Sequence, residues 1–316
     1  MPPPPADPAA PVPPRAVAPT RDVVQTYRYL RGAMVGLLLA LLLSVVIQWW
    51  FGTDRSCWLG SISAYYFTSS RTVLVGTLSA LGIALIAYEG HSPEENVLLD
   101  FSGFMALLVA AVPTVPDNRC GPSPFDETTD EIAAGIGVSV PTLVVVALVA
   151  LAVVAAIRVR SRREDSWVGA DTRTVALSLG CTAVVVLELV LVAVLRGEHA
   201  PVAHGVAATT MVAGAIAVMV CSALRVEERH GADPSELATA AAYRRTYLTL
   251  AVTLGVLLAL TVILHLTVSG FGLAVLVAEV VILVLFGAYW VVQTVELWGL
   301  GDDERPEARP VRGVRA

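Results

Sequence analysis

The chain has 316 residues, of which 56% are hydrophobic and only 15% are charged, and its mean hydropathy is +0.71. Soluble domains usually carry about 25% charged residues, so this composition predicts a protein that folds in a lipid bilayer. The net charge of −6 carries little weight, because the position of charges relative to the bilayer matters more than their sum. The sequence has no basic stripe with interleaved aromatic residues, which argues against nucleic-acid binding.

The sequence divides into a long apolar region between two polar tails. We expect residues 1–31 to form a disordered cytoplasmic tail, because the prolines of its PPPP and PVPP stretches resist both helix and sheet. Residues 299–316 are polar and rich in helix breakers, and predict a second disordered cytoplasmic tail. The first apolar run begins near Ala33 and has no A-x-A-like cleavage site after it, which predicts an uncleaved first span.

Residues 32–298 predict an all-α integral membrane bundle of about eight transmembrane helices. Each apolar run is about 17 to 23 residues long, close to the roughly 20 residues that a helix needs to cross ~30 Å of hydrocarbon. Helices are expected because backbone groups within lipid must be hydrogen-bonded internally. The runs are 33–52, 72–88, 97–115, 136–157, 174–195, 203–224, 246–268 and 271–293. Run 97–115 is the weakest, since Asp100 and Ser102 lie near its start.

Arginine distribution predicts the orientation of these helices. With the amino terminus inside, 17 of the 21 arginines fall on the cytoplasmic side, and only Arg55, Arg71, Arg119 and Arg196 fall outside. Positive residues accumulate in the cytoplasmic loops of membrane proteins, so both termini are expected in the cytoplasm. The absence of lysine and the abundance of alanine and valine favour a GC-rich bacterial genome, and hence the bacterial plasma (inner) membrane.

The positions of the four cysteines agree with this predicted arrangement of helices and loops. Cys57 and Cys120 lie in the two outer loops before and after the second and third runs, and a disulfide between them is one expectation in an oxidising compartment. Two unpaired thiols are the alternative. Cys181 and Cys221 fall inside apolar runs and are expected to act as small apolar residues. No CxxC motif occurs, and nothing in the sequence indicates a bound metal or another cofactor.

Four ionisable residues lie within or at the edge of the apolar runs, at similar predicted depth. Glu188 lies eight residues before Arg196, which places it about 12 Å below the outer interface. Glu279, His204 and His265 also fall in the outer half of their helices. Ionisable groups inside a membrane are costly and often functional, so these four residues predict a polar, ligand-binding cavity open to the outside. The alternative is that each pairs with a neighbouring hydroxyl or carbonyl group to fix helix packing.

A polar and aromatic segment precedes the second run and is expected above this cavity. It contains Ser61, Ser63, Tyr65 and Tyr66, and Arg71 follows it. Tyrosines at this depth commonly form the aromatic belt of a membrane protein. The functional alternative is an interfacial turn whose hydroxyl groups and Arg71 guanidinium bind an anionic headgroup, because forked arginine donors suit phosphate.

The stretch GSISAYYFTSSRTVLVGTLSALGIALIAYEG at 60–90, followed by NVLLDFSGFMALLVAAVPT at 96–114, resembles the signature of an uncharacterised family of bacterial multi-pass membrane proteins. A later helix that opens with His204, and a last helix with Glu279 and Gly287 to Trp290, are also similar. The resemblance covers most of 57–115 and 199–298. It implies a multi-pass membrane fold and no particular activity. The fourth and fifth runs depart from the pattern, and a variable insertion would account for them.

Three functions follow as hypotheses. The first is binding or transport of a lipid headgroup or small molecule at the outer leaflet, with the bilayer and that ligand as the partners. The second is a metal-dependent intramembrane hydrolase, which would use Ser61 or Ser63 with Asp100 and the two histidines; Asp100 is expected at the opposite leaflet, which counts against it. The third is a scaffold for a membrane complex. No catalytic motif such as G-x-S-x-G or H-E-x-x-H occurs. On the inner side, most of the short loop around Glu95 is expected to be exposed to solvent.

Overall fold

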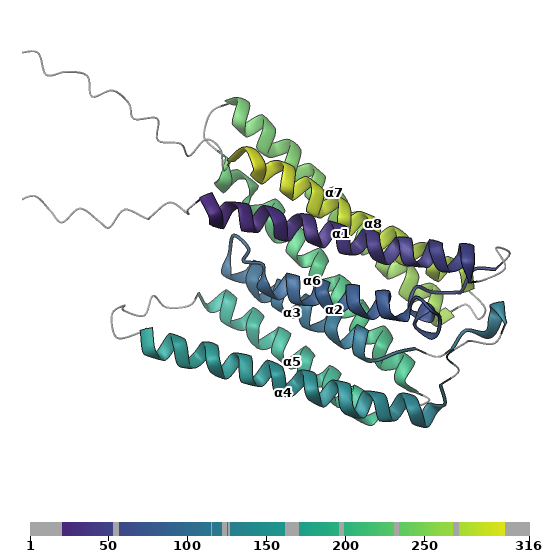
Figure 1. The fold of residues 1–316 in the computed structure, drawn as a ribbon. Coiled ribbons are helices and arrows are strands. Elements are labelled where there is room, and N and C mark those ends of the chain that lie inside the picture. Colours follow the sequence, from purple (N-terminus) through teal and green to yellow (C-terminus); the bar gives the residue numbers. More distant parts are fainter. Residues whose placement is uncertain are drawn as a thin grey trace, which may run out of the picture.

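The computed structural model describes residues 21–52, 57–114, 116–121, 125, 127–161, 171–195, 199–230, 234–267 and 272–300. Within these ranges the chain is helical and contains no strand, which confirms the all-α class (Figure 1). The α-helices are α1 (Arg21–Phe51), α2 (Arg71–Ala87), α3 (Pro93–Ala111), α4 (Thr129–Ser161), α5 (Thr172–Val194), α6 (Ala200–Arg229), α7 (Pro234–Thr267) and α8 (Gly272–Leu300). Two 3-10 helices, η1 (Ser63–Phe67) and η2 (Asn118–Cys120), lie in the loops.

Six of these helices, α1 and α4 to α8, are long and apolar enough to cross a membrane. Helix α2 is apolar but has only 17 residues, and α3 carries three carboxylates, Glu94, Glu95 and Asp100. The eight predicted runs therefore all form helices, while eight full spans remain a prediction. The length and composition of the six helices are those of a multi-pass membrane protein.

Most helices extend beyond the apolar runs, because hydropathy marks only the part of a helix that suits lipid. Helix α3 is an exception at its end, since it stops at Ala111, within the predicted run 97–115. Helix α1 begins at Arg21, so residues 21–31, which the sequence analysis assigned to the tail, are helical. Contacts with distant segments explain this extension: Tyr27 donates a hydrogen bond to Glu89, and Arg28 donates one to the carbonyl of Trp298. Residues 1–20 and 301–316 lie outside the described part of the chain.

Six helices form a closed ring of neighbours in the order α1, α2, α3, α6, α7, α8. Helix α5 packs on the outside of this ring against α3 and α6, and α4 contacts α3 beside it (Figure 1). Helix α4 exposes a long series of valines and leucines between Val138 and Val153. Such a large apolar surface is unusual for a soluble protein and suits a lipid-facing helix. We call the end of the bundle that holds residues 57–70 the outer end, and the opposite end the inner end.

Glycines allow the closest helix contact, between α2 and α3. A Cβ atom added at Gly82 would lie 2.7 Å from the carbonyl oxygen of Gly103, and one added at Gly103 would lie 2.5 Å from the carbonyl oxygen of Gly82. A Cβ atom added at Gly214 of α6 would lie 2.3 Å from the side-chain hydroxyl of Ser102 of α3. Small residues at helix contacts are the usual route to close packing in membranes.

We expect Gly82→Ala to destabilise the protein by about 1–3 kcal/mol, because the added methyl group overlaps a backbone atom that cannot move without separating α2 from α3. Gly76 is the matched control, since it lies on the same helix with open space around it. Gly76→Ala should leave stability unchanged or raise it slightly, because alanine favours a helix by about 1 kcal/mol over glycine. Thermal unfolding in detergent measures both. Equal effects at the two positions would contradict this account.

Candidate functional site

Residues 57–70, which we call the outer cap, form a compact turn at the outer end of the ring. The short helix η1 lies within it, and Tyr65 and Phe67 are fully buried. Local hydrogen bonds shape the turn: the backbone N–H of Ala64 donates to Ser61 Oγ at 3.1 Å, and Thr68 Oγ1 donates to the carbonyl of Tyr65 at 2.7 Å. Serine and threonine commonly stabilise turns in this manner.

Helix α8 binds the outer cap through Glu279. The Glu279 carboxylate accepts a hydrogen bond from the backbone N–H of Ile62, with Oε2 at 2.5 Å. One turn earlier, the backbone N–H of Leu276 donates to the carbonyl of Gly60 at 3.0 Å. The Glu279 carboxylate therefore provides the hydrogen-bond acceptor for a backbone N–H group in the cap, where the chain does not form a regular α-helix.

Helix α6 binds the same cap through His204, which is 7% exposed. Its Nδ1 lies 2.6 Å from the carbonyl oxygen of Val112, and its Nε2 lies 2.8 Å from Ser63 Oγ. Because a carbonyl oxygen can only accept, Nδ1 carries the hydrogen. In the neutral imidazole, Nε2 then accepts from the Ser63 hydroxyl. Both ring nitrogens are thus occupied by the cap and the end of α3.

Arg71 lies at the edge of the cap and is also paired. Its guanidinium donates to the carboxylate of Glu127 and to the hydroxyl of Tyr66, and it stacks over the Tyr66 ring with its Cζ 4.1 Å from the ring centre. Burial raises the pKa of Tyr66, while the positive charge of Arg71 opposes that shift. Tyr66 therefore stays protonated at neutral pH, and Arg71 is held by protein groups.

A disulfide joins the cap to the segment after α3. Cys57 and Cys120 are bonded with an S–S distance of 2.04 Å and a Cα–Cα distance of 5.6 Å. Beside it, the backbone N–H of Gly60 donates to Asp117 Oδ2 at 2.8 Å. Trp58 stacks on Trp49 of α1, with ring centres 4.6 Å apart. The cap is therefore attached to α1, α6, α8 and the α3–α4 loop.

The structure brings most of the predicted site residues together in and around this cap. They are Ser61, Ser63, Tyr65, Tyr66, Arg71, His204 and Glu279. Most of the polar groups among them bond to one another or to the backbone. These contacts agree with the alternative that the polar side chains fix the packing of the helices. That the same residues bind a ligand stays a prediction. The backbone of His265 belongs to α7, but its side chain lies outside the described part of the structure.

Glu188 differs from the other predicted residues. It lies on α5, is 1% exposed, and its Oε1 has no hydrogen-bond partner. The residues of α5 on either side of it, Val184, Val185, Leu189 and Val192, belong to the apolar core of the outer half. An unpaired polar group in such surroundings costs roughly 1–3 kcal/mol or more. Glu188 is therefore an ionisable predicted site residue whose position packing alone does not explain. In the outer cap, the buried hydroxyl of Tyr65 also has no hydrogen-bond partner.

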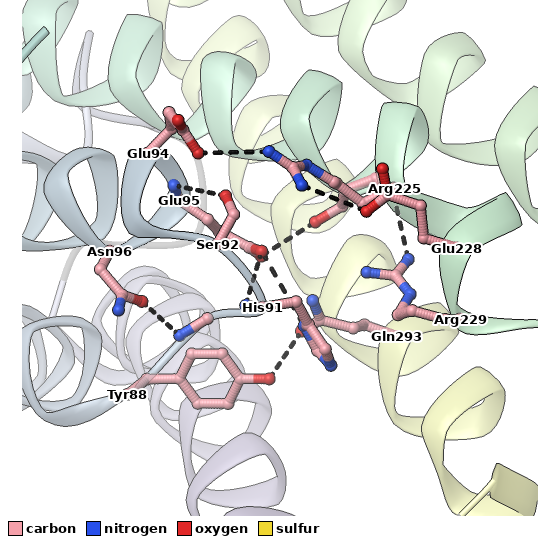
Figure 2. A network of polar contacts seen from close by, with 12 residues as sticks. Tyr88, His91, Ser92, Glu94, Glu95, Asn96, Arg225, Glu228, Arg229 and Gln293 are labelled. Carbon is pink, nitrogen blue, oxygen red and sulfur yellow. Dashed lines mark hydrogen bonds and ion pairs between the residues drawn. The ribbon is translucent and has the colours of Figure 1, made fainter. Parts of the chain in front are cut away.

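A second polar cluster, which we call the inner network, lies at the opposite end of the ring (Figure 2). Glu95 of α3 is completely buried and accepts a hydrogen bond at 3.0 Å from Ser222 Oγ of α6. The Ser222 oxygen lies 2.9 Å from the Tyr289 hydroxyl of α8, which in turn accepts from Gln293 Nε2 at 3.0 Å. Tyr88 then donates to Gln293 Oε1 at 3.4 Å. Five side chains from four parts of the chain thus form one continuous series of hydrogen bonds.

A buried ion pair completes the inner network. Arg229 of α6 donates from Nε and Nη2 to the two carboxylate oxygens of Glu296 of α8, at 3.2 and 3.3 Å. The side chains are 8% and 0% exposed. Tyr247 of α7 donates a further hydrogen bond to Glu296. Arg229 also donates from Nη2 to the carbonyl of Ser222 at 3.1 Å, which links the pair to the preceding series.

Sequence reasoning missed the inner network, and its expectation that the loop around Glu95 is solvated is wrong for Glu95 itself. Polar spacing on α8 was the available signal. Tyr289, Gln293 and Glu296 lie four and three residues apart in a mostly apolar helix, which places them on one face. Ser222 and Arg229 have the same one-face spacing on α6.

Comparison with known proteins assigns no family: no protein-family model, no curated protein and no solved structure matches the chain. Among the described residues, no group of three or more His, Cys, Asp or Glu side chains is arranged to hold a metal ion.

Proposed function

We propose that the protein binds or transports a small molecule or lipid that enters from the outer leaflet, in a bacterial inner membrane with both termini in the cytoplasm. Charge supports this orientation. Apart from Arg71 and Arg119 at the outer end, the arginine side chains that the structure describes lie toward the inner end, at Arg28, Arg31, Arg173, Arg225, Arg229, Arg244 and Arg245. This asymmetry agrees with the positive-inside rule.

The observation that carries the proposal is the unpaired, buried carboxyl group of Glu188. Glu279, His204 and Arg71 bond to groups of the outer cap and the adjoining loop, so a structural role accounts for these three. Glu188 has no such partner, although it lies among apolar side chains in the outer half of the bundle. An ionisable group that is buried in a membrane protein without a partner is a functional-site hypothesis, because such groups often bind a ligand or transfer a proton. The resemblance to the uncharacterised membrane-protein family covers neither α5 nor Glu188, and it supplies no activity.

Glu188→Gln should remove the stabilisation of the protein by added ligand. We expect the melting temperature of the wild-type protein in detergent to rise with at least one probe from a panel of phosphatidylethanolamine, phosphatidylglycerol, cardiolipin and neutral or cationic amphiphiles, because a ligand that binds the folded state stabilises it. The rise should shrink to the detergent baseline in Glu188→Gln. Glu227→Gln is the control, since Glu227 is exposed and pairs with Arg244. An equal rise in both variants would remove Glu188 from the site.

A hydrolase is the second candidate, and one contact favours it. Ser63 Oγ lies 2.8 Å from His204 Nε2, a distance suited to a nucleophile and its base. The imidazole is oriented by the neutral carbonyl of Val112, where a hydrolase triad has a carboxylate that stabilises the imidazolium. A serine-reactive fluorophosphonate should label Ser63 if this candidate holds, and Ser63→Ala should abolish the label. A scaffold role predicts instead that a partner protein copurifies with the wild-type protein and with Glu188→Gln alike.

A further inference from the structure

An apolar groove lies between α3, α5 and α6, on the side of the ring that α5 covers. Its volume is about 390 Å³, and it is open toward the surface. Its walls include Leu98 and Phe101 of α3, Leu177, Cys181 and Val184 of α5, and Gly214 of α6. Small and aliphatic side chains predominate, with almost no polar surface. The groove therefore suits the apolar part of a ligand.

Glu188 continues the α5 wall of this groove. It lies four residues after Val184 and seven after Cys181, so the three side chains share one face of the helix. That face is directed at α3 and α6, which are the neighbours of α5 in the bundle. The unpartnered Oε1 of Glu188 thus lies one turn beyond the groove, toward the outer end, and is buried from solvent.

Other charged groups on the surrounding helices are remote or engaged. In the outer halves of α3 and α6, His204 is the titratable side chain, and its nitrogens bond to Ser63 and Val112. The thiol of Cys181 lies on α5 itself, in the groove wall. The remaining titratable groups of these helices lie in their inner halves: Arg173 on α5, Glu94, Glu95 and Asp100 on α3, and Cys221, Arg225, Glu227, Glu228 and Arg229 on α6.

We propose that this groove binds a hydrophobic monovalent cation in exchange for the proton of Glu188. The apolar body of the cation occupies the groove, and its positive charge lies against the carboxylate. On entry the Glu188 O–H bond breaks, its electron pair stays on the carboxylate oxygen, and the proton leaves to bulk water, so the charge of the site is conserved. The inference rests on the proposed function and names the class of ligand for that site.

Charge decides between ligand classes. A bare carboxylate in an apolar interior is costly unless a positive charge accompanies it, so Glu188 favours a cationic ligand over an anionic one. A divalent metal ion would require several oxygen ligands, whereas the described residues contain no cluster of that kind. A neutral lipid chain would fill the groove without any use for the buried carboxyl group. Because the cation and the proton compete for the same carboxylate, Glu188 cannot hold both at once.

Tetraphenylphosphonium, a hydrophobic monovalent cation, is the probe for this proposal. Titration calorimetry of the full-length protein in detergent should show that its affinity rises by up to about tenfold per pH unit while the carboxyl group titrates, because each bound cation displaces one proton. Measurements in buffers of different ionisation enthalpy should give about one proton released per cation. Glu188→Gln should lose at least about tenfold in affinity and all proton release, whereas Glu188→Asp should keep the release.

Two further variants separate the groove from the carboxyl group. Val184→Trp fills the groove and should weaken cation binding while leaving Glu188 in place. Glu227→Gln should bind the cation as the wild-type protein does. Cation binding that is independent of pH, or unchanged in Glu188→Gln, overturns the inference. If the cation fails to bind but a lipid or neutral amphiphile still stabilises the protein through Glu188, the exchange proposal fails and the proposed function stands. If no probe acts through Glu188, both fail.

Discussion

Arg229→Ala is expected to destabilise the protein by about 3–5 kcal/mol, because it leaves Glu296 buried without its charged partner. Tyr247 would still donate one hydrogen bond to that carboxylate, and His230 Nδ1 would still lie 3.9 Å from it. Neither group replaces the two guanidinium donors, because His230 Nδ1 also lies 3.0 Å from the carbonyl of Val226. The bond from Arg229 to the carbonyl of Ser222 would be lost as well. The loss should appear as a lower melting temperature in detergent and as faster proteolysis at the inner ends of α6 and α8.

Two comparisons make this prediction specific. Arg244→Ala removes a guanidinium from an exposed pair with Glu227, on helices that also meet at the inner end, and exposed pairs contribute about 0–1 kcal/mol. The double variant Arg229→Met with Glu296→Leu should recover much of the lost stability, since an apolar pair of similar volume often replaces a buried ion pair without cost. If Arg229→Ala is no worse than Arg244→Ala, the inner network does not hold the helices together.

Removal of the disulfide is expected to destabilise the protein by about 2–4 kcal/mol. The Cys57–Cys120 bond closes a loop with a sequence separation of 63 residues, which contains the outer cap, α2 and α3. Its loss gives the unfolded chain more conformational freedom and releases one attachment of the cap. The double variant Cys57→Ser with Cys120→Ser should therefore melt at a lower temperature than the wild-type protein.

Matched cysteines provide the control. Cys181→Ser with Cys221→Ser changes the same number of thiols without touching a disulfide, because both residues are free. A reducing agent should lower the melting temperature of the wild-type protein and leave that of the Cys57/Cys120 variant unchanged. A melting temperature of the wild-type protein that does not respond to reduction would show that the bond contributes little.

Depth along each helix was predictable from the sequence, and rotation was not. Apolar length placed Glu188 and Glu279 at similar distances from the outer interface, and the structure has both in the outer half of the bundle. Their surroundings differ because Glu279 meets a backbone N–H of the outer cap, whereas Glu188 meets apolar side chains. That difference depends on contacts with other helices and loops, such as the bond between Glu279 and Ile62 at a separation of 217 residues, which spacing within one helix cannot reveal.

The burial of Glu95 in the inner network was also not predictable from the sequence of its own helix. Glu95 lies in the first turn of α3, where a carboxylate is ordinary and usually solvated. It is buried because Ser222 and Tyr289 from α6 and α8 close over it. Periodic polar spacing on α8 pointed to a buried polar face, but its partners on other helices become visible only when the ring is assembled.

Helices α4 and α5 leave and rejoin the ring at the same end. The chain departs after α3 at the outer end, and α6 starts again at that end after α5. Because this pair of helices begins and ends at the outer end, α6, α7 and α8 would have the same direction in the bundle without it. The contacts that close the ring therefore do not depend on this hairpin, whereas the groove beside Glu188 exists only where α5 lies against α3 and α6.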